Sequence, residues 1–211
     1  MSDISVDVIN VCRRVDTKGF VAATDGNISV RLPNGNILAT PTSLNKAFVQ
    51  KEDLVELSLE GKQISGTRKP STEIKMHLFI YQQRNDVNAV VHCHPVYATG
   101  FAAAGIQLKE NIFPEVIVGF GNIPLAEYAT PSTEEMGESL RPYVKNNDAM
   151  MLANHGVVTY GKDVWDAYFK MEKVEQIAHM LFVAETLGGA KQLSTAHVAR
   201  LKELAQTIYW K

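Results

Sequence analysis

Three histidines in this sequence stand where their imidazole nitrogens could converge on a metal ion. His92 lies near the end of the apolar run at residues 87–93, which is typical of a buried strand, and His94 directly follows this run. Because side chains alternate along a strand, both imidazoles face one side of a sheet and Cys93 faces the other. His155 lies in an Asn-His-Gly turn between two apolar runs. Three nitrogen ligands with an open position are typical of a catalytic metal site; the alternative is a pair of histidines hydrogen-bonded along a strand.

Three further clusters offer hydroxyls, amides and backbone N–H groups that suit an anion. The clusters are Gly26-Asn27-Ile28-Ser29, Thr40-Pro41-Thr42-Ser43 and Lys69-Pro70-Ser71-Thr72-Glu73. The third opens a predicted helix, and the dipole at a helix N-terminus favours a negative charge. Taken one at a time, these residues are also what turns and helix caps require. Together they predict a cradle for a phosphate group.

The rest of the pattern predicts a sheet with helices packed on it. Apolar spacing and capping signals predict helices at residues 4–15, 71–81, 95–105, 132–144, 163–187 and 194–210, the fourth of them opened by a capping box at residues 132–135. Apolar runs predict a hairpin at residues 26–40 and strands at residues 54–59, 87–93, 112–118, 149–153 and 157–160. Strands come in hairpins as often as they alternate with helices, so a mixed, largely antiparallel sheet is expected. No linker divides the chain, which predicts a single domain over residues 1–211.

Composition limits the partners that such a domain would bind. The 211 residues include 21 Lys and Arg against 23 Asp and Glu, a formal net charge of −2, and 45% of them are hydrophobic. This composition excludes a disordered tail and a disulfide-stapled mini-domain, and the charge predicts neither nucleic acid nor a membrane as a partner. The longest uncharged stretch, residues 88–108, is interrupted by polar residues, Gly and Pro, so we expect it to form a strand, a turn and a helix and not a membrane span. Two distant cysteines and no secretory signal predict a cytoplasmic protein.

In this order and spacing, the motifs resemble those of the class II aldolase/adducin family, and within it the fuculose-phosphate type of sugar-phosphate aldolase. The motifs are Gly26-Asn27-Ile28-Ser29, the Thr-Pro-Thr-Ser turn, Pro70-Ser71-Thr72-Glu73, His92-Cys93-His94-Pro95 and Asn154-His155-Gly156. The resemblance covers residues 26–209. It implies a three-layer αβα fold and a homotetramer whose active sites lie between neighbouring subunits.

The resemblance also implies a role for each motif. His92, His94 and His155, together with Glu73, would hold one divalent metal ion per subunit, which is zinc by family expectation, with manganese or cobalt as alternatives. Glu73 would also be the catalytic acid/base, and glutamate rather than aspartate at this position resembles the aldolases and not the related epimerases. The family's phosphate pocket corresponds to Gly26, Asn27, Thr42, Ser43, Ser71 and Thr72.

Three positions bear on which sugar phosphate is used. At Phe113 the fuculose-phosphate type has a tyrosine, and phenylalanine has no hydroxyl to donate, which favours a less oxygenated aldehyde product. Glu115 falls near a catalytic glutamate of the methylthioribulose-1-phosphate dehydratases of this fold; it is either a second acid/base or a solvated strand residue. Tyr209 matches a tyrosine that in the aldolases reaches a neighbour's active site; otherwise it is a helix residue packed beside Trp210.

These expectations predict a metal-dependent aldolase that cleaves a ketose 1-phosphate, such as 5-deoxyribulose 1-phosphate or fuculose 1-phosphate. The products would be dihydroxyacetone phosphate and a short aldehyde. Cleavage between C3 and C4 leaves an enediolate, whose negative charge a divalent cation stabilises as a Lewis acid, so no lysine Schiff base is needed. Two alternatives stay open: a methylthioribulose-1-phosphate dehydratase, and an adducin-type interaction module without catalytic activity.

Overall fold

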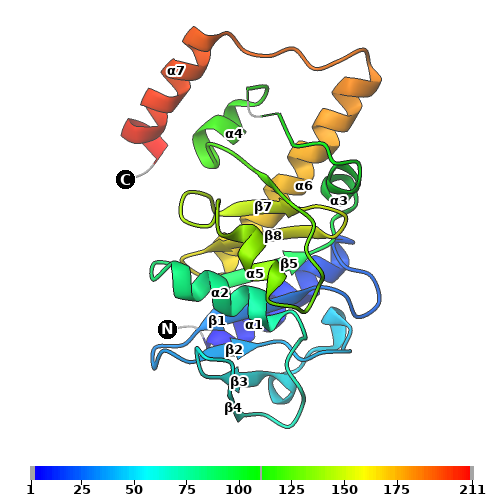
Figure 1. The fold of residues 1–211 in the computed structure, drawn as a ribbon, viewed down its shortest axis with the longest axis vertical. Helices are drawn as coiled ribbons and strands as arrows, with labels where there is room; N and C mark the ends of the chain where they lie inside the picture. Colours follow the sequence, from blue (N-terminus) through cyan, green and yellow to red (C-terminus); the bar gives the residue numbers. More distant parts are fainter. Residues whose placement is uncertain (1–2, 110, 210–211) are drawn as a thin grey trace.

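An eight-stranded mixed sheet forms the centre of this computed structural model, which describes residues 3–109 and 111–209 (Figure 1). Its strands are β1 (Asn27–Arg31), β2 (Ile37–Ala39), β3 (Val55–Leu57), β4 (Gln63–Ser65), β5 (Ala89–Cys93), β6 (Leu125–Ala126), β7 (Ala149–Leu152) and β8 (Gly156–Gly161). They lie in the order β4-β3-β2-β1-β5-β8-β7-β6. Among the described strands, β6 and β7 pair in parallel and the other neighbours are antiparallel. The expectation of a mixed, largely antiparallel sheet is confirmed.

Helices cover both faces of this sheet, which gives the three-layer αβα arrangement. On one face, α1 (Ile4–Thr17), α3 (Val96–Ala103) and α6 (Val164–Thr186) share one apolar core. On the other face, α2 (Ile74–Gln83) and α5 (Glu135–Leu140) share a second core. The helices α4 (Pro114–Gly119) and α7 (Thr195–Leu204) contact each other at the end of the molecule opposite β3 and β4 (Figure 1).

Strand β5 shows how the sheet places functional side chains. Val91 and Cys93 point into the core shared with α1 and α6, whereas Val90 belongs to the core shared with α2. Alternation therefore turns His92 toward the α2 face. Strand β1 runs beside β5 with Asn27 opposite His92, so the Asn27 side chain faces α2 as well.

The prediction of a strand at residues 112–118 is wrong, because the chain forms α4 there. Phe113 is the N-cap of this helix and Pro114 stands in its first turn. Proline suits that position, where its missing N–H costs nothing, and it would interrupt a strand ladder. The apolar, β-branched residues 116–118 hid this signal. Glu115 is therefore a helix residue and not a strand residue.

The capping box predicted at residues 132–135 is also wrong. Helix α5 begins at Glu135, with Glu134 as its N-cap and no side-chain cap. Ser132 instead has a left-handed backbone with a φ of 68°. The helix ends at Leu140, short of the predicted end near residue 144.

The C-terminal helix and two short strands also differ from the prediction. The α-helix expected to continue to Trp210 ends at Leu204 and is followed by a π-helical turn, Ala205–Tyr209; Trp210 lies outside the described residues. The strands β4 and β6 were not predicted, because β4 is exposed throughout and has one apolar residue, Ile64, and β6 has only two residues. None of the described helices is both long enough and apolar enough to span a lipid bilayer.

Candidate active site

Three imidazoles and one carboxylate converge on the α2 side of the sheet. Ligand nitrogens of His92, His94 and His155 all lie within 4.8 Å of one another. The Glu73 carboxylate reaches the same point: its Oε1 lies 3.0 Å from His155 Nε2, and its Oε2 lies 3.3 Å from His92 Nε2. Side chains from the start of α2, from the end of β5 and from the turn between β7 and β8 thus face a common centre.

The hydrogen bonding of His92 shows why this centre suits a cation. His92 Nδ1 lies 2.9 Å from the Val157 carbonyl oxygen, so we assign the ring hydrogen to Nδ1, which donates it. Its Nε2 then presents a lone pair to His94 Nε2, at 3.1 Å, and to the Glu73 carboxylate. Lone pairs and a carboxylate at this separation repel one another unless a proton or a metal ion lies between them. A backbone carbonyl on the second ring nitrogen is also the common support of a metal-bound histidine.

The electrostatics of the centre favour a neutral His94 and an ionised Glu73. Burial lowers the pKa of His94 to about 4, so its ring stays neutral. Burial raises the pKa of the Glu73 carboxyl, but its contacts with the His92 and His155 rings outweigh this effect and hold the pKa below its ordinary value. Neutral imidazole and carboxylate are the protonation states in which these side chains bind a metal ion.

A buried polar network lies beside the centre. Ser29 Oγ lies 2.7 Å from His77 Nδ1 and 2.9 Å from the Tyr81 hydroxyl. Burial lowers the pKa of His77 to about 3, so its ring stays neutral. Asn27, two residues before Ser29 on β1, donates from Nδ2 to Glu73 Oε2 at 2.8 Å. This hydrogen bond orients the carboxylate toward the histidines.

A cleft of ≈ 300 Å³ opens beside Glu73, His94 and His155, which line one part of it. All six residues that the resemblance assigns to the phosphate pocket also line it: Gly26, Asn27, Thr42, Ser43, Ser71 and Thr72. Glu73 is the N-cap of α2, so the N-terminus of this ten-residue helix lies at the cleft. Its dipole and free N–H groups favour an anion there.

Backbone strain gathers around this cleft. In the described ranges, the non-glycine residues in the left-handed region are Ala23, Ser43, Ser132 and Asn154, with φ between 50° and 68°. Ser43 and Ser132 line the cleft, and the other two adjoin residues that line it. Such conformations cost about 1–3 kcal/mol each and persist where the surrounding structure holds them, commonly at functional sites.

Two glycines let the backbone approach the centre closely. A Cβ at Gly156 would lie 2.6 Å from the Cys93 carbonyl oxygen and 2.6 Å from His94 Cδ2. A Cβ at Gly26, whose φ is 72°, would lie 2.9 Å from the His92 carbonyl oxygen. Since these separations are shorter than real Cβ contacts, a larger residue at either position would displace the histidine-bearing strand.

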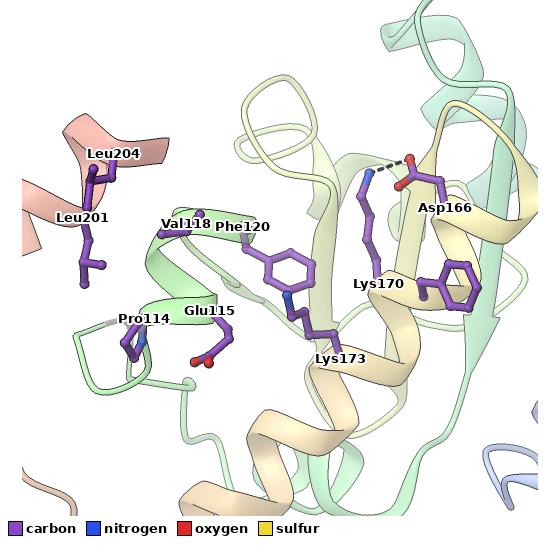
Figure 2. A pocket seen from close by; sticks show the side chains of 11 residues that line it. Pro114, Glu115, Val118, Phe120, Asp166, Lys170, Lys173, Leu201 and Leu204 are labelled. Atoms are coloured by element: carbon purple, nitrogen blue, oxygen red, sulfur yellow. Dashed lines mark hydrogen bonds and ion pairs between the residues drawn. The ribbon is translucent and has the colours of Figure 1, made fainter. Parts of the chain in front are cut away.

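Neither Phe113 nor Glu115 lines this cleft in the single chain. Figure 2 shows Glu115 on α4 among the residues of a different pocket, of ≈ 380 Å³, which α4 forms with α6 and α7. None of the residues that line this pocket lines the cleft. Phe113 packs against the core shared with α1 and α6. The backbone of Tyr209 belongs to the π-helical turn, and its side chain lies outside the described part of the chain.

Sequence reasoning missed four residues that line the cleft, namely Thr24, Asp25, Pro131 and Ser132. Asp25 Oδ2 lies 3.7 Å from His94 Nδ1, the ring nitrogen that does not face His92. Asp-Gly and Pro-Ser are ordinary turn signals. Nothing in them separates a turn that lines a site from one that does not.

The sequence matches a known family over most of its length. Residues 6–182 match the family described as Class II Aldolase and Adducin N-terminal domain. A Methanococcus maripaludis protein named L-fuculose phosphate aldolase is 36% identical over 182 residues, which cover 86% of this chain and 97% of that protein. An Escherichia coli protein named 3-oxo-tetronate 4-phosphate decarboxylase is 32% identical over 170 residues, which cover 79% of this chain and 80% of that protein.

Two further relatives bear on substrate and fold. A Bacillus thuringiensis protein named 5-deoxy-D-ribulose 1-phosphate aldolase is 30% identical over 188 residues, which cover 89% of this chain and 88% of that protein. A solved structure named L-fuculose 1-phosphate aldolase superposes with a TM-score of 0.89 at 27% identity, covering 98% of this chain and 97% of that chain. Sequence and fold therefore lead to the same group of proteins.

Proposed function

This chain belongs to the class II aldolase and adducin family, and from this premise we propose that it is a metal-dependent aldolase. The proposed reaction cleaves a ketose 1-phosphate to dihydroxyacetone phosphate and a short aldehyde. One observation carries the proposal: the Glu73 carboxylate meets three imidazoles at the wall of a cleft that offers hydroxyls and a helix N-terminus. An acid/base group, a metal site and an anion site would then lie side by side.

His92, His94, His155 and Glu73 would hold one divalent metal ion per chain. Three imidazoles and a carboxylate accept several first-row ions, so we propose zinc, with manganese and cobalt as alternatives. When bound, such an ion supplies Lewis-acid chemistry, which polarises the substrate carbonyl and stabilises the negative charge that develops on its oxygen. No lysine lines the cleft in the described part of the chain, which speaks against a Schiff-base mechanism there.

Glu73 is the proposed acid/base. In the cleavage direction the C3–C4 bond breaks, its electron pair stays on C3 as an enediolate, and the C4 hydroxyl gives its proton to the Glu73 carboxylate as the aldehyde forms. Glu73 then delivers a proton to C3 and completes dihydroxyacetone phosphate; in the reverse direction it removes this proton. The hydrogen bond from Asn27 holds the carboxylate in place for this transfer. The lowered pKa of Glu73 keeps it ionised, as a base must be.

The cleft is the proposed phosphate site. Its lining includes the hydroxyls of Thr42, Ser43, Ser71 and Thr72, and the glycine turn at Gly26 leaves the backbone open to a ligand. The N-terminus of α2 adds a favourable dipole. These groups would hold the phosphate while the carbon chain of the sugar extends toward Glu73 and the histidines.

We propose that the aldehyde half of the substrate is short and poorly oxygenated, as in 5-deoxyribulose 1-phosphate. Phe113 supports this because it offers no hydroxyl, and a relative named for that substrate is 30% identical. Since Phe113 does not line the cleft of its own chain, we propose a homotetramer in which Phe113 and Tyr209 reach the cleft of a neighbouring copy. A small phosphorylated substrate also suits the cytoplasm, the proposed location.

The decarboxylase among the relatives favours a second candidate reaction. That protein is named for 3-oxo-tetronate 4-phosphate. Loss of CO₂ from C1 of this β-keto acid leaves the electron pair of the broken bond on C2, and protonation of C2 gives dihydroxyacetone phosphate. The enediolate is the one formed by aldol cleavage, so Glu73 and the phosphate site would serve both reactions. The two reactions differ in the fragment that leaves, which is an aldehyde in aldol cleavage and CO₂ in decarboxylation.

A product assay distinguishes two other interpretations from the aldolase. A dehydratase of methylthioribulose 1-phosphate would need Glu115 as a second acid/base, and in the single chain Glu115 lines the α4 pocket and not the cleft. An adducin-type interaction module would have no need for three histidines and Glu73 to converge.

A product assay on the metal-loaded, full-length protein tests the proposal. The substrates are 5-deoxyribulose 1-phosphate, fuculose 1-phosphate, 3-oxo-tetronate 4-phosphate and methylthioribulose 1-phosphate, each followed by NMR. Dihydroxyacetone phosphate with an equal amount of aldehyde supports the aldolase. Release of CO₂ alone indicates the decarboxylase and loss of water alone the dehydratase. No turnover with zinc, manganese or cobalt would indicate the interaction module.

A further inference from the structure

A buried lysine connects two loops of the proposed phosphate site, loop A (residues 23–27) and loop B (residues 41–44). Lys46 is 1% exposed. Its Nζ donates to the Thr24 carbonyl oxygen in loop A at 3.0 Å and to the Leu44 carbonyl oxygen in loop B at 2.8 Å. Both loops line the cleft, whereas Lys46 does not. Lys46 therefore joins the two loops from within the protein.

The backbone of both loops needs such a connection. Ala23 in loop A and Ser43 in loop B have φ values of 50° and 56°, and non-glycine residues keep this conformation only where the surroundings hold it. The acceptors of Lys46 directly follow these two residues in the chain. Asn45 adds a third contact, because its Nδ2 donates to the Ala23 carbonyl oxygen at 2.7 Å. The side chains of Lys46 and Asn45 thus donate hydrogen bonds to the backbone at, or directly after, the two strained residues.

No cationic side chain lines the cleft in the described part of the chain. The acidic side chains that line it are Asp25 and Glu73, and none of its described lining residues is Lys or Arg. Glu73 faces the proposed metal site, so a phosphate dianion in the cleft would meet the uncompensated carboxylate of Asp25, which repels it. Lys46 supplies a positive charge in contact with both loops, in an interior where charges are screened less than at the surface. Burial lowers the pKa of Lys46, the carboxylates of Asp25 and Asp16 oppose this, and two carbonyl acceptors favour the ammonium form.

We propose that Lys46 is the positioning residue of the phosphate site: it holds loops A and B in their anion-binding conformation and places a positive charge behind them. This inference rests on the proposed function in one respect, since it takes the anion to be the substrate's phosphate. It explains how a chain with a net charge of −2 can hold a phosphate without a basic surface.

Binding of inorganic phosphate to the metal-loaded, full-length protein tests this role. Lys46→Met removes the donor and the charge, and Lys46→Gln restores a donor without the charge. The matched control is Lys51→Met, because Lys51 is 63% exposed in its side chain and pairs with Asp3 at 2.6 Å, away from the loops. We expect the Kd for phosphate to rise about 10-fold to 100-fold in Lys46→Met, by a smaller factor in Lys46→Gln, and by less than about twofold in Lys51→Met.

Kinetics and metal content separate positioning from general support of the fold. We expect the KM for the sugar phosphate to rise in Lys46→Met while kcat changes less than about threefold, because the loops bind the phosphate equally in the ground and transition states. Metal stoichiometry and the thermal midpoint should stay near those of Lys51→Met. A joint loss of metal, stability and kcat in both Lys46 variants would overturn the proposal.

The phosphate measurement also separates this inference from the proposed function. Lost phosphate binding in Lys46→Met, in a protein that turns over none of the four sugar phosphates, would support the role of Lys46 and reject the proposed function. Aldolase activity with an unchanged KM in Lys46→Met would support the proposed function and reject the role of Lys46. Equal affinity in Lys46→Met and Lys51→Met, or no phosphate binding by the wild type, would overturn the role of Lys46.

Discussion

Glu73 Oε1 and His155 Nε2 lie 3.0 Å apart, although one residue opens α2 and the other occupies the turn between β7 and β8. This contact joins the proposed acid/base to the proposed metal site. The other oxygen of the same carboxylate accepts a hydrogen bond from Asn27 on β1. Three separate elements therefore meet at one side chain, and changes there should affect chemistry and metal binding more than folding.

Replacement of the Glu73 carboxylate should abolish most activity and leave the fold intact. Glu73→Gln keeps the shape but cannot exchange a proton, so we expect kcat to fall by about 100-fold or more. Glu134→Gln is the matched control, because Glu134 is 83% exposed in its side chain and pairs with Lys75 at the surface. Steady-state kinetics with circular dichroism measures both effects. Similar kcat values for the two variants would contradict the role of Glu73.

A methyl group at Gly156 should weaken metal binding. The added Cβ would lie 2.6 Å from His94 Cδ2 and from the Cys93 carbonyl oxygen, so the histidines must shift. We expect Gly156→Ala to lower zinc affinity about tenfold or more, measured by competition with a chelator. Gly100→Ala, where a Cβ meets nothing within 4 Å, should bind zinc as the wild type does. An unchanged affinity in Gly156→Ala would show that these histidines do not hold the metal.

Removal of the metal should stop the reaction, and a Schiff-base trap should not. Incubation with EDTA is expected to abolish activity, and added zinc, manganese or cobalt to restore it, because the donor set accepts several ions. Borohydride in the presence of substrate should leave activity unchanged, since no described lining residue of the cleft is a lysine. Activity that resists EDTA, or covalent inactivation by borohydride, would reject the proposed mechanism.

The buried His77 should make the protein less stable in acid. Burial lowers the pKa of His77 from 6.5 to about 3. Across this pH window the unfolded chain binds a proton that the folded chain does not, so the free energy of unfolding falls as the pH falls from 6.5 toward 3, by up to a few kcal/mol. Urea unfolding at about pH 7 and about pH 5 should show a weaker pH dependence in His77→Gln. An equal pH dependence of the free energy of unfolding in the wild type and His77→Gln would contradict the role of His77.

Active sites shared between copies predict complementation. Glu73→Gln and Tyr209→Phe should each lower activity alone, and mixed assemblies should regain activity because some sites combine the intact Glu73 of one chain with the intact Tyr209 of another. Glu73→Gln mixed with His155→Ala is the control, since both changes lie in the same cleft and no recovery is expected. The measurement is activity after co-refolding. Failure of the first mixture to exceed its parents would refute the shared site.

The positions of the histidines followed from local rules. Alternation along β5 predicts that His92 and His94 share a face, and the apolar runs on either side of Asn-His-Gly predict a turn at His155. The order of strands in the sheet brings the end of β5, the turn at His155 and the start of α2 to one cleft. Local periodicity carries no information on that order, so the resemblance to a family supplied it.

Other features of the site had no usable signal in the sequence. Lys46 looks like any surface lysine until the fold buries it, and Ser132 looks like a helix cap until its backbone takes a left-handed conformation. The apolar stretch around Glu115 satisfied a strand pattern, although Pro114 fitted the first turn of a helix equally well. In each case tertiary packing decided between two locally acceptable conformations.

Exchange of the C3 proton of dihydroxyacetone phosphate in D₂O tests the central claim most directly, because it requires the enediolate and no knowledge of the aldehyde. Proton NMR of the metal-loaded wild type should show loss of one of the two C3 protons, with no loss after EDTA treatment and a rate at least about 100-fold lower in Glu73→Gln. Absence of exchange in the metal-loaded wild type, or exchange at the same rate in Glu73→Gln, would contradict the assignment of Glu73 and the histidine cluster as an aldolase site.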